Sequence, residues 1–112
     1  MKDDRLFLQH ILAAVKTVDD YIKDTSRVAF VQDRMMSDAV VRQLEIIGEA
    51  ARNLSEQCRD AHQDIEWGQI IGMRNRLIHA YFQVDIELVW EIVTTDLPVL
   101  KGQVESILAG WR

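Results

Sequence analysis

Hydrophobic residues recur every three or four positions along most of this chain, which is the spacing of helices that bury one face. The first stripe predicts a helix that starts at Asp3 or Asp4 and ends near Lys23. A short second helix is expected over residues 28–31, a segment with too few residues to be stable alone. The longest stripe predicts a third helix over residues 37–57. The pattern of the first half therefore indicates helices and no strands.

The second half of the chain predicts two further helical regions. The polar segment over residues 56–63 is expected to be a connection, and the acidic residues after it suit the first turn of a fourth helix. Asp85 can cap the next helix. Pro98 fits either a new helix capped by Asp96 or a kink in one long helix, and both stay open. Because no segment alternates like a strand, we predict an all-α bundle of about five helices in a single domain, residues 1–112.

Composition limits the class of protein that such a bundle can be. The chain has 112 residues, 48% of them hydrophobic, with only one proline, which is typical of a compact helical domain. A net charge of -5 gives no general attraction to nucleic acid, so a phosphate ligand must be bound by a local basic patch. The single Cys58 excludes an intrachain disulfide, and no apolar run is long enough to cross a membrane. We therefore expect a soluble cytoplasmic protein.

Five side chains with chemical capability lie close together between residues 73 and 82. They are Arg74, Asn75, Arg76, His79 and Tyr81. No Asp or Glu occurs from residue 67 to residue 84, so an anionic ligand would meet no local carboxylate there. The histidines lack the spacing of metal ligands, and we expect neither a metal nor a cofactor. The simpler interpretation is that both arginines are ordinary solvated helix positions and that His79 is a cation at a helix end.

The positions of these residues around a helix constrain how they can act together. On one straight helix Arg74 has apolar neighbours, whereas His79 lies about 140° away around the axis. We therefore expect Arg74 to be partly buried with an acceptor, and Glu49 is a candidate partner for Arg74 or Arg76, unless it is simply solvated. Arg74 and His79 can meet only if the helix ends near His79 or if a second chain completes the site. The small residues 48–51 favour close approach of another helix.

The motif and the residues around it resemble the HEPN superfamily. Arg74-Asn75-x-x-x-His79 is similar to the R-x4-6-H motif of that superfamily, and the addition of Tyr81 resembles its HepT-type toxin branch. Similar signatures occur at Ile46–Ala51, Gly72–Asn75, Val84–Trp90 and Asp96–Pro98. The resemblance covers roughly residues 5–108, well beyond the motif itself.

This resemblance implies an antiparallel HEPN bundle that forms a homodimer and cleaves RNA without a metal, as the toxin of a type VII toxin–antitoxin pair. Arg74 and His79 match the family's catalytic pair, with Asn75 as a polar companion. Arg76 and Glu49 are expected to support them, from their charge and position alone. Tyr81 matches the tyrosine that a cognate MNT-type nucleotidyltransferase antitoxin adenylylates. The chemistry agrees, because an imidazole can move protons near neutral pH and a guanidinium can stabilise charge on phosphate oxygens.

Two other functions stay open at this level. In the first, the chain is a non-catalytic helical module that binds a nucleotidyltransferase partner, and Arg74 forms a buried ion pair with Glu49. The acidic composition favours this alternative, whereas the intact pair of Arg74 and His79 favours the ribonuclease. In the second, the chain is a nucleotide-binding subunit that lends Tyr81 to the chemistry of a partner.

Overall fold

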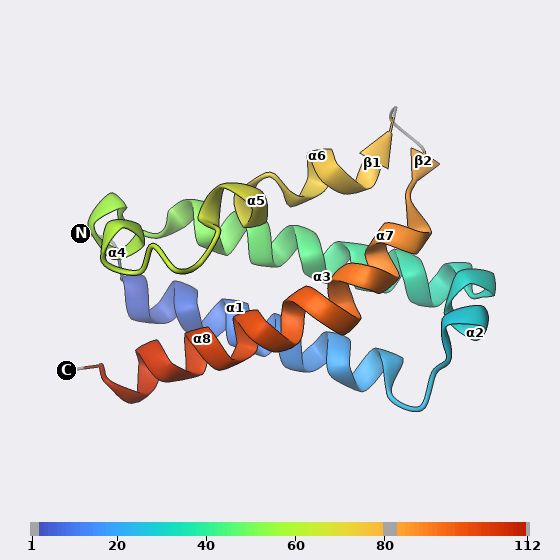
Figure 1. Cartoon of the computed structure of the whole chain (residues 1–112), viewed down its shortest axis with the longest axis horizontal. Coiled ribbons are helices and arrows are strands. Elements are labelled where there is room, and N and C mark those ends of the chain that lie inside the picture. The colour runs from blue at the N-terminus through green and yellow to red at the C-terminus, as the bar shows by residue number, and fades with distance from the viewer. Residues whose placement is uncertain (1–2, 80–82, 112) are drawn as a thin grey trace.

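The computed structural model of the chain describes residues 3–79 and 83–111, apart from the side chain of His79. The elements are α1 (Asp4–Ile22), α2 (Arg27–Gln32), α3 (Arg34–Asn53), α4 (Glu56–Ala61), α5 (Trp67–Ile71), α6 (Met73–Leu77), β1 (Ile78–His79), β2 (Gln83–Val84), α7 (Ile86–Glu91), the π-helical turn η1 (Ile92–Asp96) and α8 (Leu97–Ala109). Figure 1 shows α1, α3 and the continuous α7–η1–α8 rod side by side, with α5 and α6 along α3. The predicted all-α class is confirmed.

The first helix and its buried stripe are as predicted. Asp3 caps α1 because its carboxylate accepts a hydrogen bond from the Leu6 amide at 3.1 Å. The inward positions of α1 pack against α3 and α8, and their side chains are fully buried at Leu8, Ile11, Val15 and Val18. Burial of this stripe against the facing stripe of α3 forms the main hydrophobic core.

Two helix boundaries differ from the prediction. The third helix spans Arg34–Asn53 rather than residues 37–57, because Asp33 caps it by accepting a hydrogen bond from the Met36 amide at 3.0 Å. The expected connection over residues 56–63 contains α4, whose cap is Ser55. Asp4 of α1 accepts hydrogen bonds from the Ser55 amide at 2.7 Å and its hydroxyl at 2.6 Å. A contact between distant segments therefore stabilises a helix that the local polar sequence did not indicate.

The predicted motif helix is two short helices. Gly72 separates α5 from α6, and α6 ends at Leu77. The chain then forms a two-residue antiparallel ladder in which Ile78 pairs with Val84 and His79 with Gln83. This ladder leaves the all-α class unchanged, because two residues on each side are too short a segment for strand-like alternation to be visible in the sequence.

The last third of the fold is one continuous helical path. Asp85 caps α7 as predicted, accepting a hydrogen bond from the Leu88 amide at 3.1 Å. Asp96 does not cap a new helix; its backbone is α-helical and its side chain makes no cap. Instead the Leu97 amide bonds to the Ile92 carbonyl, five residues back, just before Pro98. The π-helical turn thus lies where proline cannot donate the usual hydrogen bond.

Gly48 sets the distance between α3 and α5. A Cβ atom added at Gly48 would lie 2.9 Å from the backbone oxygen of Ile70, closer than real side chains allow. The predicted close approach at residues 48–51 is therefore confirmed, with a helix of the same chain as the neighbour. Ala50 and Ala51 are buried as well. This small-residue segment is used inside the chain and does not support a contact with a second copy.

Within the described part of the chain, no helix combines the length and apolar character needed to cross a membrane.

Candidate functional site

Arg74 projects from α6 toward solvent. Met73 and Leu77 on the same helix are buried at 3% and 0% exposure and attach α6 to the core. The Arg74 side chain is 69% exposed, so the expectation of partial burial is wrong. The helix break at Gly72 is the reason, because angular positions counted from α5 do not continue into α6. The guanidinium is accessible to a ligand from solution.

The acidic partner of Arg74 is Glu45 rather than the candidate Glu49. Arg74 Nε lies 3.7 Å from Glu45 Oε2, and the Glu45 side chain is 29% exposed. The reason is that α3 runs antiparallel to the α5–α6 segment (Figure 1). Gly48 of α3 lies opposite Ile70 of α5. One helical turn forward from Ile70 leads to Arg74, and one turn back from Gly48 leads to Glu45. Glu49 lies on the other side of Gly48 and is exposed.

A hollow of about 370 Å³ lies beside Arg74, between α3 and the α5–α6 segment, and we name it the Arg74 hollow. Its lining combines guanidiniums and carboxylates over a small apolar floor. The lining residues are Arg42, Glu45, Gly48, Glu49, Arg52, Ile71, Met73 and Arg74. With three arginines against two glutamates, the hollow carries a positive balance beside the exposed guanidinium.

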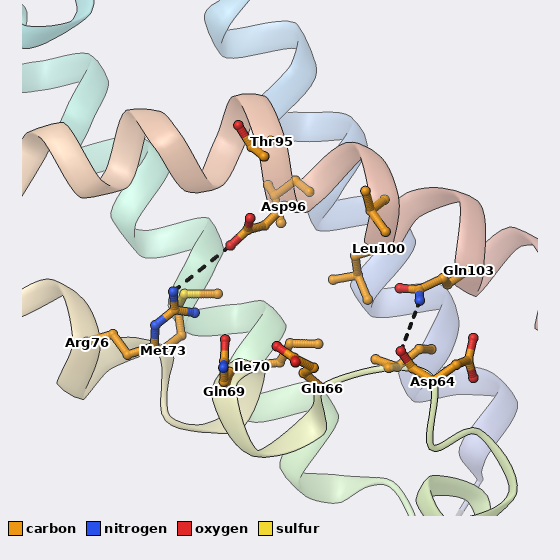
Figure 2. Close-up of a pocket in the computed structure, with 13 residues that line it drawn as sticks. Asp64, Glu66, Gln69, Ile70, Met73, Arg76, Thr95, Asp96, Leu100 and Gln103 are labelled. Atoms are coloured by element: carbon orange, nitrogen blue, oxygen red, sulfur yellow. Dashed lines mark hydrogen bonds and ion pairs between the residues drawn. The ribbon is translucent and has the colours of Figure 1, made fainter.

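Arg76 points to the opposite side of α6. Its side chain is 31% exposed, and Arg76 Nη2 lies 4.0 Å from Asp96 Oδ2 on the π-helical turn. Figure 2 shows this pair at one end of a second hollow of about 320 Å³, which we name the Arg76 hollow. At the other end, Gln103 donates a hydrogen bond to the Asp64 carbonyl at 3.3 Å. Arg76 is thus held by an acid of its own chain.

The other predicted site residues are placed only in part. Asn75 is exposed on α6. The backbone of His79 lies in β1, paired with Gln83, but its side chain and Tyr81 lie outside the described residues. Because α6 ends at Leu77, the structure agrees with the alternative in which the helix ends near His79.

Sequence reasoning missed both carboxylates that pair with the arginines. Asp96 was considered only as a helix cap, and Glu45 was passed over for Glu49, four residues later on the same helix. The signal that could have found Glu45 is the small residue Gly48, if its contact with α5 had been used to set the register of α3. Among the described residues, no group of three or more His, Cys, Asp or Glu side chains could hold a metal ion.

Comparison with known proteins gives consistent matches over nearly the whole chain. The family described as "Ribonuclease HepT-like" matches residues 11–107. A protein named "Putative RNase" from Caldanaerobacter subterraneus subsp. tengcongensis is 42% identical over 108 residues, covering 96% of each chain. A "Putative RNase" from Methanocaldococcus jannaschii is 39% identical, covering 95% of this chain and 97% of its own length.

A further relative, named "Probable ribonuclease HepT", comes from Thermococcus cleftensis and is 37% identical over 101 residues, covering 90% of this chain and 92% of its own. No solved structure gives a significant match to the chain. The family match includes both arginines of α6 and extends through the helices that position them. The chain belongs to the HepT-like ribonuclease family.

Proposed function

We propose that this protein is a metal-independent endoribonuclease that acts as the toxin of a toxin–antitoxin pair. The observation that carries the proposal is the family match over residues 11–107, which includes the motif of Arg74 and His79. The names of the relatives support RNA as the substrate. The exposure of Arg74 supports catalysis over the non-catalytic alternative, which required a buried pair with Glu49.

The proposed reaction uses the RNA's own 2′-hydroxyl group. The 2′ oxygen attacks the adjacent phosphorus and loses its proton, while the bond from phosphorus to the 5′ oxygen breaks and that oxygen gains a proton. The products are a 2′,3′-cyclic phosphate and a 5′-hydroxyl end. His79 moves a proton in this scheme, because imidazole titrates near neutral pH. Arg74 stabilises the additional negative charge on the phosphorane oxygens, as a guanidinium that is always protonated.

The direct test is cleavage of RNA by the purified protein in the presence of EDTA. We expect cleavage with 2′,3′-cyclic phosphate ends, and we expect His79→Ala and Arg74→Ala each to abolish it with the helical circular dichroism unchanged. Asp38→Asn is a matched surface control, because the exposed Asp38 has Arg34 of the same helix as its one ion-pair partner among the described residues. Full activity in both motif variants would contradict the proposal.

Control by a partner is the second part of the proposal, and it rests on the family resemblance of Tyr81. A cognate MNT-type nucleotidyltransferase would transfer AMP from ATP to the phenol oxygen, with release of pyrophosphate. The attached phosphate adds bulk and negative charge two residues from His79, where it can pair with Arg74 in place of substrate.

Co-expression with the partner should therefore add mass in whole AMP units to the peptide containing Tyr81 and abolish cleavage. Tyr81→Phe should still cleave RNA and should escape inactivation. If Tyr81→Phe gains AMP and is silenced as the wild type is, another residue is the control site.

A homodimer with both motif copies along one cleft is the expected assembly, from the family resemblance. Sedimentation at micromolar concentration measures it directly. An active monomer would contradict it.

A further inference from the structure

We propose that Glu45 is a positioning residue for Arg74, which fixes the guanidinium so that its outer edge faces a substrate phosphate. The inference rests on the proposed ribonuclease function and names a residue outside the Arg/His motif. It starts from one ion pair that joins the longest helix of the fold to the short helix carrying the motif: Arg74 Nε to Glu45 Oε2 at 3.7 Å.

The atoms that form this pair decide what the rest of Arg74 can do. A guanidinium has three nitrogens in one plane, and phosphate is bound best when two N–H groups of one edge point at two oxygens. Glu45 approaches the Nε side, and the guanidinium of Arg74 makes no other ion pair or hydrogen bond with the described residues. The edge formed by the two terminal nitrogens is left for a phosphate. A carboxylate at those terminal nitrogens would instead have occupied the edge that substrate needs.

The two partners differ in how firmly the fold holds them. Glu45 lies in the middle of the 20-residue α3, between the fully buried Leu44 and Ile47, and its side chain is 29% exposed. Arg74 extends from a five-residue helix and is 69% exposed. A long, exposed arginine loses many rotamers when it binds, and a fixed counter-charge at ion-pair distance removes part of that loss in advance. The rigid element therefore orients the mobile side chain.

A carboxylate beside an RNA site also has an electrostatic disadvantage, because it repels the substrate phosphate. Removing the charge of Glu45 therefore changes kcat in opposite directions, depending on whether positioning or repulsion dominates. If Glu45 positions Arg74, Glu45→Gln lowers kcat, while binding of RNA is unchanged or tighter. If Glu45 only masks Arg74, the same variant raises kcat. The sign of the change separates the two.

The experiment compares wild type, Glu45→Gln, Glu45→Asp and the control Asp38→Asn. Asp38 lies seven residues before Glu45 on α3, so Asp38→Asn removes the same charge from a similar face without affecting Arg74. We expect Glu45→Gln to lower kcat about tenfold, less than the roughly hundredfold loss that a 1 Å misplacement can cause. Its Kd for 2′-O-methyl RNA, which cannot be cleaved, should not weaken. Glu45→Asp should restore part of kcat, and Asp38→Asn should match wild type.

A second readout does not depend on cleavage. Relaxation of the Arg74 Nε–H group by ¹⁵N NMR should show a lower order parameter in Glu45→Gln and an unchanged one in Asp38→Asn. An unchanged order parameter, or kcat equal to or above wild type, overturns the inference, and an inactive Arg74→Ala in the same assay leaves the proposed function standing. Absence of cleavage by the wild type overturns the proposed function and this inference with it.

Discussion

The two arginines of α6 stand two residues apart in sequence and face hollows of opposite character. The Arg74 hollow is lined by three arginines and two glutamates, and its arginine is 69% exposed. The Arg76 hollow is lined by one arginine with the acids Asp64, Glu66 and Asp96, and its arginine is only 31% exposed. The guanidinium of Arg74 is open to an anion from solution, whereas that of Arg76 is less exposed and pairs with Asp96 in an acidic hollow.

This difference shows how one short helix can direct two arginines to surroundings of opposite charge. Positions two residues apart on a helix point about 200° apart, so Arg74 and Arg76 reach different surroundings. An RNA phosphate approaching the Arg76 hollow would meet three carboxylates, and repulsion from them opposes binding. Approaching the Arg74 hollow, it would meet a positive balance. The comparison supports the proposal that Arg74 binds the phosphate and favours a structural part for Arg76.

The largest expected effect concerns RNA cleavage by Arg74→Ala and Arg76→Ala, the two variants that each remove one guanidinium from α6. Arg74→Ala should lower kcat by about 10²–10³-fold, the usual loss for one donor to a charged transition state. Arg76→Ala should lower it less than tenfold, because its side chain is less exposed and its hollow is lined by three carboxylates that repel a phosphate. Single-turnover kinetics at saturating RNA measures both. Equal losses would mean that both arginines bind phosphate and that the two hollows are not functionally distinct.

The sequence could predict the parts of the fold that depend on local physics. The caps at Asp3 and Asp85 were visible because a capping carboxylate acts within three residues of its own position. The cap of α4 is equally local, since Ser55 accepts a hydrogen bond from the Cys58 amide. This short helix was missed because its polar sequence has no buried stripe, and what stabilises it is the contact of Ser55 with Asp4, 51 residues earlier. Contacts of that range leave no local pattern.

The candidate site was predictable in its residues and not in its pairings. Arg74 and Arg76 were identified from the motif, but their partners Glu45 and Asp96 depend on three features that no periodicity reveals. These are the break at Gly72, the register set where Gly48 meets Ile70, and the π-helical turn before Pro98. Each changes which face a side chain occupies, by shifting the helix phase or sliding one helix along another.

The next effect, smaller than the loss in Arg74→Ala, concerns the register that brings Glu45 to Arg74. Gly48→Ala should destabilise the fold by about 1–3 kcal/mol, because the new Cβ would lie 2.9 Å from the Ile70 oxygen and α5 must move away. Gly102→Ala is the matched control. Gly102 is exposed in α8, a Cβ added there would meet nothing within 4 Å beyond the helix's own nearby backbone, and the change should stabilise the fold by about 0.5–1 kcal/mol.

Thermal unfolding by circular dichroism measures both changes, at roughly 4–8 °C per kcal/mol for a domain near this size. Because α5 leads directly into α6, Gly48→Ala should also reduce cleavage at temperatures where the protein stays folded. A stabilised Gly48→Ala variant would show that α3 and α5 are not in tight contact, and the register argument for Glu45 would fail with it.

The smallest effect expected is the coupling between Arg76 and Asp96. The two side chains are 31% and 51% exposed and their closest charged atoms are 4.0 Å apart, so solvent screens much of their attraction. A double-mutant cycle with Arg76→Ala and Asp96→Ala, measured by urea unfolding, should give a coupling of about 0.2–1 kcal/mol. The coupling should shrink when the salt is raised from roughly 0.1 M to 1 M, because the Debye length falls from about 10 Å to 3 Å. If no coupling is measured at low salt, Asp96 does not hold Arg76. The structural part proposed for Arg76 would then be wrong, and its guanidinium could bind RNA together with Arg74.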